Sequence, residues 1–230
     1  MTESKPDLSN LRPRTPRGAA IAGIIFAVLF GISQILILLS LPEISSDRLE
    51  WLGVGTASLA LTLVPFAGIA FLWFLGVVRE RLGELEDQFF STLLLGSALL
   101  YLAMIFIAAS IAGALLTIYA FDPGILINSG VYTFARILAF NIHSIYAVRM
   151  SGMFMIVSGI IWIRTRTMPR WLSFITFILA LVLLISIGFT IWITLIFPAW
   201  VFLVSVYILI LNYRYQDKDR EKKDSLTLDD

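Results

Sequence analysis

The sequence contains no cysteine and only one histidine, His143. The absence of cysteine excludes disulfides, thiolate metal ligands and cysteine nucleophiles. A single histidine without cysteine also leaves too few ligands for a zinc or haem site built by this chain. We therefore expect no metal site and no cofactor.

Acidic residues are missing from long stretches of the chain. No Asp or Glu lies between Gln88 and Asp122, or between Pro123 and Gln216. Proton-coupled pumps and many cation transporters depend on carboxylates buried in the membrane, so this class of function is disfavoured. The apolar runs also contain no Lys, which excludes a Schiff-base attachment. With no acid–base pair at depth, an enzyme is the least favoured class.

Apolar residues, in contrast, dominate the sequence. They make up 59% of the 230 residues, only 14% are charged, and the mean hydropathy is +0.90. These values lie far outside the usual composition of a soluble domain, so the lipid bilayer is the expected surrounding. The net charge is only +1, and the basic residues do not gather into one binding face, so nucleic acid is not an expected partner.

Six apolar segments have the length of a membrane-spanning helix, which needs about 20 residues to cross a hydrocarbon core of about 30 Å. They cover residues 18–41, 51–78, 89–121, 131–163, 171 to about 187, and about 190–211. A tight turn near Gly188 is expected between the last two. The sequence therefore predicts an all-α polytopic membrane bundle of six transmembrane helices.

The third and fourth segments are too long for a straight crossing. As continuous helices each would measure about 50 Å, so they must tilt, break or project from the bilayer. The connection FDPGILINSG contains no basic residue and is placed outside. An alternative interpretation makes residues 131–141 a separate short helix that lies at the outer interface.

The basic residues alternate along the chain in a way that predicts the orientation. Loops rich in Lys and Arg stay on the cytoplasmic side, and Arg48 is the one basic residue in the remaining connections. Both termini are therefore predicted to be cytoplasmic. The four basic groups are Lys5, Arg12, Arg14 and Arg17; Arg79 and Arg81; Arg164, Arg166 and Arg170; and Arg214, Lys218, Arg220, Lys222 and Lys223.

Three regions follow from this pattern. Residues 1–17 form a basic cytoplasmic leader, which three prolines make disordered. Residues 18–212 form the transmembrane domain, and residues 213–230 form a charged cytoplasmic tail. Disorder is expected in this tail from Gln216 onward.

The fourth segment carries the polar residues that could form a site. Arg149 lies about 21 Å from the inner end of this helix, roughly 9 Å beneath the outer edge of the hydrocarbon. Asn141 lies within about 80° of Arg149 around the helix, whereas Arg136 and His143 share the opposite side. The helix thus presents two polar stripes.

We predict a ligand site on the Arg149 stripe. Ser33, Gln34 and Ser58 lie at similar depth on the first two segments, and a guanidinium with amide and hydroxyl neighbours suits an anion. The predicted ligand-binding residues are therefore Arg149, Asn141, Gln34, Ser33 and Ser58. Alternatively, Arg149 only packs or extends its charged end to the headgroups. His143 has no acidic partner in sequence reach and is expected to be structural.

A series of small residues recurs at every fourth position of the first segment. Ala19, Gly23, Ala27 and Gly31 lay a shallow groove along one helix face. Membrane helices associate through close packing, because lipid tails are as apolar as leucine. We therefore expect this face to pack against another helix inside the bundle or against a partner protein.

In three stretches, VPFAGIAFLWFLGVVRERLGELEDQFF, PRWLSF and FPAWVFLVSVYIL, the chain resembles a family of uncharacterised multi-pass membrane proteins from bacteria. The likeness covers most of the chain after Arg17 and implies a bacterial cytoplasmic (inner) membrane location. The family has no known activity, so the resemblance implies no catalytic or binding residue.

Two functional hypotheses remain. The first is a non-enzymatic membrane protein that binds a small polar or anionic ligand or a lipid. Such a protein could also transport this ligand as a permease does. The second is a structural or regulatory subunit of a membrane protein complex, which binds its partner through the first-segment groove or the link from Arg79 to Gln88. Anionic lipid of the inner leaflet is a further expected partner.

Overall fold

A computed structural model describes residues 16–39, 43–45, 48–50, 53–82, 88–128, 130–166, 168–186 and 191–226. The predicted leader lies almost wholly outside these residues, as does the turn expected near Gly188. Apart from one short hairpin, the regular structure of these described residues is helical. The elements are α1 (Pro16–Leu39), β1 (Glu43–Ser45), β2 (Arg48–Glu50), α2 (Val54–Leu82), α3 (Gln88–Phe121), α4 (Pro123–Asn128), α5 (Val131–Asn141), the π-helical η2 (Ile142–Ala147), α6 (Val148–Thr165), α7 (Arg170–Ile185), the 3-10 helix η3 (Ile191–Leu195) and α8 (Ile196–Leu226).

Five helical stretches of the described chain are long and apolar enough to cross a membrane. They are Gly18–Ile37, Val54–Arg79, Gln88–Phe121, Val131–Thr165 and Trp192–Tyr213. These stretches indicate a multi-pass membrane protein. Helix α7 has only 16 residues and is about 24 Å long, which is shorter than the hydrocarbon core.

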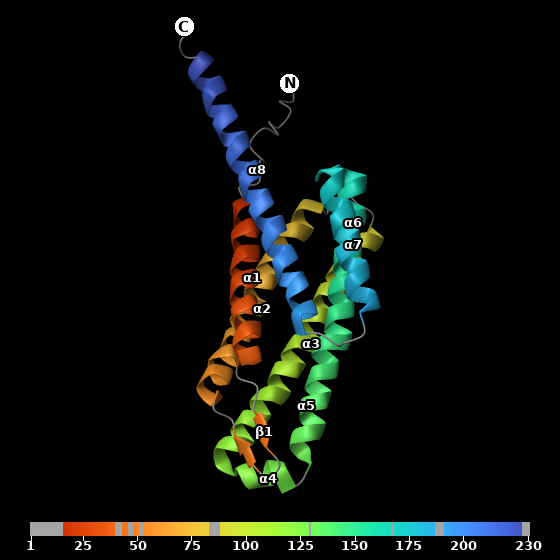
Figure 1. Ribbon diagram of the computed structural model, residues 1–230. Helices are drawn as coiled ribbons and strands as arrows, with labels where there is room; N and C mark the ends of the chain where they lie inside the picture. Colours follow the sequence, from red (N-terminus) through yellow and green to blue (C-terminus); the bar gives the residue numbers. More distant parts are fainter. Residues whose placement is uncertain are drawn as a thin grey trace, which may run out of the picture.

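The helices form two packed groups that α3 joins. Helix α1 packs against α2 and α8, α6 packs against α7, and α3 contacts both α2 and α6. The first turn of α1 and the last turn of α8 lie at the same end of the bundle (Figure 1). At the opposite end, which we call the hairpin end, β2 lies against α4, and the two strands pair antiparallel with Ile44 opposite Leu49.

Aromatic side chains fill the centre of the bundle. Phe71 of α2 is fully buried, and its ring lies 4.8 Å from Phe26, 5.8 Å from Tyr101 and 5.8 Å from Phe197, between ring centroids. These four rings come from four different helices, so the cluster ties α1, α2, α3 and α8 together. Aromatic pairs in such tilted and edge-to-face arrangements attract one another beyond simple burial.

The outer surface of the bundle is also apolar. On α1, the side chains spaced three or four residues apart on one face are all exposed, and they are aliphatic: Ile21, Ile25, Val28, Ile32 and Ile35. A soluble protein would place polar residues on such a face. An aliphatic outer face is what contact with lipid tails requires.

Helices α5, η2 and α6 form one uninterrupted rod. The residues at both junctions, Ile142 and Val148, have right-handed helical backbone angles. The alternative that residues 131–141 form a separate interfacial helix is therefore wrong, because α5 continues the same helix toward the hairpin end. The rod has 35 residues, about 52 Å, and α3 has 34, so both exceed the bilayer thickness.

The prediction of disorder from Gln216 is wrong as well for residues 216–226, because α8 continues to Leu226; residues 227–230 lie outside the described part of the chain. Lys, Arg, Glu and Gln, which are frequent in this stretch, are good helix formers, and a preceding apolar helix supplies the nucleus that a short isolated helix lacks. The end of α8 therefore extends past the other helices (Figure 1).

Candidate functional site

A cavity of about 510 Å³ lies near the hairpin end, between α1, α2, α3, α5, η2 and η3. Helix α5 packs against α3 and α4 but makes no extensive contact with α1 or α2, and this separation leaves the space. The lining side chains are Phe30, Ser33, Gln34, Ile37, Ala57, Leu61, Val64, Ile105, Ala108, Ala109, Ala112, Leu115, Leu116, Tyr132, Arg136, Ile137, Ala139, Phe140, His143, Ser144 and Thr194.

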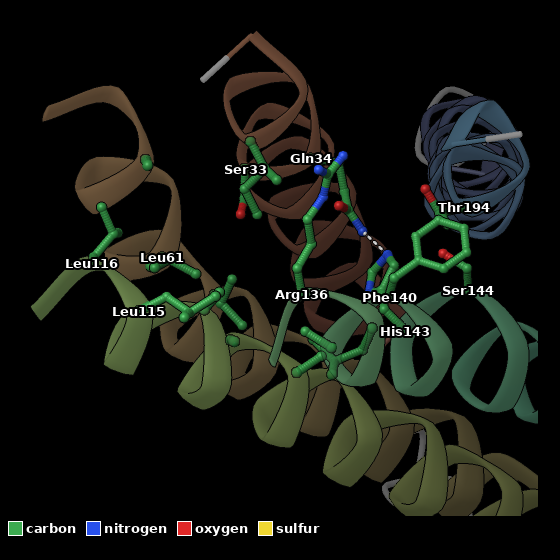
Figure 2. A pocket seen from close by; sticks show the side chains of 18 of the residues that line it. Ser33, Gln34, Leu61, Leu115, Leu116, Arg136, Phe140, His143, Ser144 and Thr194 are labelled. Carbon is green, nitrogen blue, oxygen red and sulfur yellow. Dashed lines mark hydrogen bonds between the residues drawn. The ribbon is translucent and has the colours of Figure 1, made fainter. Parts of the chain in front are cut away.

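A hydrogen bond between Gln34 and His143 crosses one side of the cavity (Figure 2). The two Nε2 atoms are 2.7 Å apart. An amide nitrogen can only donate, so the Nε2 of His143 accepts, and the proton of the neutral ring lies on Nδ1. Helix α1 and the π-helical segment η2 are thus joined by a polar contact within an otherwise apolar bundle.

Arg136 supplies the positive charge of the cavity. Its side chain extends from α5 toward Gln34 (Figure 2) and interacts with the hydroxyl of Tyr132, one helical turn earlier. Asp122 is the one acidic side chain in the part of the chain whose side chains are described, and it accepts a hydrogen bond from the backbone N–H of Gly124. Within that part, Arg136 therefore has no carboxylate partner.

The π-helical segment η2 contributes two side chains to the cavity, His143 and Ser144. A π-turn holds an additional residue, and such turns occur frequently at functional sites. Here such a segment brings both an imidazole and a hydroxyl to the same space.

The opposite wall of the cavity is apolar and built from small residues. Four of the lining side chains on α2 and α3 are alanines, namely Ala57, Ala108, Ala109 and Ala112. Since a methyl group fills little of the space between helices, these positions create the room that larger side chains would occupy. This wall offers no hydrogen-bonding side chain.

Two of the five predicted ligand residues lie at this cavity. Gln34 faces it with its amide, and Ser33 lines it while its Oγ donates to the carbonyl of Ala60 at 2.8 Å. Ser58 is exposed on α2 and does not line the cavity. The structure therefore brings the two α1 residues together with Arg136 and His143.

Arg149 and Asn141 are half-buried and lie away from the cavity. The Nη1 of Arg149 donates to the carbonyl of Ile145 at 3.0 Å, one turn earlier on the same rod. Arg136 and His143 share a side, as their spacing predicts, and this is the side that faces α1. The sequence shows two polar stripes but does not show which of them faces Gln34. For this reason the predicted ligand-binding residues did not include Arg136.

The small residues of α1 pack inside the protein. Ala19, Gly23 and Ala27 are buried, and a Cβ placed on Gly23 would meet Ser205 of α8 and Phe74 of α2. Gly31 is half-buried with open space beside it. Most of the groove is thus occupied by helices of the same chain, which leaves little of it for a partner protein.

The comparisons with known proteins identify no relative. No known protein family matches the chain, and no curated protein or solved structure is similar to it. The likeness to bacterial multi-pass proteins therefore stays a prediction. Among the described residues no three His, Cys, Asp or Glu side chains gather into a possible metal site.

Proposed function

We propose that this chain is a non-enzymatic, multi-pass protein of a bacterial cytoplasmic membrane that binds a small polar or anionic ligand or a lipid in the cavity beside Arg136. A permease-like role is one form of this function. The observation that carries the proposal is a guanidinium at the cavity that has no carboxylate partner among the side chains that the structure describes.

The chemistry of the polar wall favours an anion. A guanidinium presents several N–H donors in one plane and pairs with carboxylate, phosphate or sulfate oxygens through two parallel hydrogen bonds. The amide of Gln34 lies near this guanidinium, and the hydroxyl-bearing Thr194 also lines the cavity (Figure 2). A cation would find only repulsion from Arg136 here, so an anionic group is the complementary partner.

We further propose six crossings with both termini in the cytoplasm. The basic groups predict this orientation, and α7 would cross as a short helix with local thinning of the bilayer. Because the chain has no native cysteine, single cysteines can report accessibility. In intact cells, a membrane-impermeant thiol reagent is expected to label Asp122→Cys but not Gln88→Cys, although both positions are exposed. The reverse labelling pattern would contradict the orientation.

The ligand site can be tested with a pair of arginine variants from the same rod. We expect Arg136→Gln to weaken anion binding by about 10- to 100-fold, since a hydrogen bond to a charged group contributes about 1.5–3 kcal/mol. Arg149→Gln is the matched control, because that side chain lies away from the cavity. Sulfate, phosphatidylglycerol and decanoate serve as probes, and the shift in unfolding temperature in a neutral detergent is the measurement.

The outcomes separate the possible sites. If an anion raises the unfolding temperature of the wild type and of Arg149→Gln, but not of Arg136→Gln, the result supports a ligand site in the cavity. If anions fail to stabilise only the Arg149→Gln variant, the ligand site lies instead on the Arg149 stripe, as the sequence predicts. If none of the three anions stabilises the wild type, the proposed function is wrong.

A further inference from the structure

The charged and hydrogen-bonding side chains of the cavity come from α1, α5, η2 and η3, whereas the facing wall of α2 and α3 is entirely apolar. Figure 2 shows Arg136, Gln34 and His143 on one side and Leu61, Leu115 and Leu116 on the other. A small inorganic anion would occupy only the polar wall and leave the apolar one empty. A ligand that contacts both walls must carry a charged group and an apolar body.

The size of the cavity limits that apolar body. At about 30 Å³ for each water-sized group, a volume of about 510 Å³ holds roughly 17 such groups. This matches one hydrocarbon chain of about a dozen carbons with its head group. A phospholipid with two long acyl chains is much larger than this volume, so a single-chain ligand is the better match.

The position of the polar wall also fits an amphiphile. The stretch from His143 to Thr165 spans about 33 Å as a helix, close to the thickness of the hydrocarbon core. Counted from Thr165 as the inner end of the rod, His143 therefore lies at the headgroup level of the leaflet at the hairpin end, and Arg136, about 10 Å further along the helix, lies outside the hydrocarbon core. A charged head at this level needs no transfer of its charge into hydrocarbon.

The cavity is open to the outside of the bundle along α5. Three of its lining residues, Arg136, Ile137 and Phe140, are exposed while they also face the cavity. Two of these are apolar, as are the exposed neighbours Phe134 and Leu138 on the same helix. An apolar rim of this kind gives a hydrocarbon chain access from the surrounding lipid without passage through water.

We propose that the ligand is a single-chain amphiphile with an anionic head. The head binds Arg136 and the amide of Gln34, and the chain lies along the alanine-rich wall of α2 and α3, which it reaches from the leaflet at the hairpin end beside α5. This inference rests on the proposed function, because it assigns the class of ligand to the same site.

The test uses a fatty acid that carries a photoreactive group in its chain, added to the full-length protein in phosphatidylcholine nanodiscs. After illumination, mass spectrometry maps the adducts. We expect adducts on Leu61, Ile105 and Leu116, which line the apolar wall. Unlabelled decanoate should compete, whereas sulfate and the methyl ester of the same chain should not.

Two variants fill the cavity, and a third provides the control. Ala112→Phe, or Ala109→Leu if the first does not fold, should reduce the wall adducts about fivefold or more, since the added side chain occupies cavity space that the ligand chain needs. Ala103→Phe adds the same ring to an exposed position of α3 and should leave the adducts unchanged.

The results distinguish the two levels of the proposal. The proposal of a single-chain ligand would be wrong if adducts formed only on lipid-facing side chains. It would also be wrong if the variants that fill the cavity left the wall adducts unchanged. Competition by sulfate as strong as that by decanoate would also overturn it, yet would leave anion binding at Arg136 intact. No competition by any anion, together with no stabilisation in the melting assay, would overturn both.

Discussion

The Phe71→Ala protein is expected to lose about 3 kcal/mol of unfolding free energy, at the lower end of the range for a buried phenylalanine. Phe71 is fully buried and touches rings from three other helices. Lipid tails are as apolar as this core, so the transfer of the side chain out of water contributes little. The cost comes from the dispersion contacts that the remaining cavity loses.

Phe66→Ala is the matched control for this prediction. It removes the same ring from the same helix at a position that is 58% exposed, so the change in unfolding free energy is expected to stay within about 0.5 kcal/mol. Reversible unfolding by SDS in mixed micelles measures both variants. Equal losses would show that the aromatic cluster does not hold the bundle together.

The same cluster supports the candidate site. Phe30 lines the cavity and stacks on Phe26, with 5.5 Å between ring centroids, and Phe26 in turn contacts Phe71. The ring that forms part of the cavity wall is therefore fixed by the core beneath it. A pocket whose wall is packed in this way is largely preformed, as ligand sites usually are.

The ends of the long helices could be predicted from the sequence, because a change from apolar to charged residues marks where a helix leaves the membrane. The expected segment of residues 89–121 differs from α3 by one residue at its start. The last helix was harder to predict. Its apolar part ends near Leu211, but α8 continues to Leu226, since polar helix formers extend a helix without any apolar signal.

The inward faces of the helices could not be predicted from apolarity. Ile25 is exposed and Phe26 is buried, yet both are strongly apolar. In a soluble protein water makes this distinction, whereas here lipid and core offer similar surroundings. Small residues carry more information: Gly23 and Ala27 are buried, as expected from their spacing.

The choice between the two polar stripes of the fourth segment depends on packing alone. Arg136 and Arg149 have the same side chain on the same rod, and only the position of α1 brings one of them to Gln34. The π-helical segment lies between them, and no periodicity in the sequence marks it. The stripes were thus predictable, whereas the identity of the one that faces the cavity required the contacts between helices.

Gly23→Leu is expected to prevent the protein from folding stably, because this position has no room for a side chain. Even a Cβ would overlap Ser205 of α8 and come within 2.9 Å of Phe74 of α2. Overfilling a packed interior typically costs about 1–3 kcal/mol, and more when the neighbours cannot move. Gly31→Leu is the control, since nothing lies within 4 Å of a Cβ there, and fluorescence-detected size exclusion measures the folded yield of both.

A milder pair of substitutions tests whether the contact between Gly23 and Ser205 causes this destabilisation. Gly23→Ala should lower the unfolding temperature, and adding Ser205→Ala should recover part of that loss, because it removes the Oγ that the new methyl group would overlap. Ser205→Ala alone should cost little, since its buried Oγ has no hydrogen-bond partner. This coupling is expected only for residues in direct contact. If the α1 groove instead served a partner protein, Gly23→Leu would leave the isolated protein stable and abolish only its co-purification with that partner.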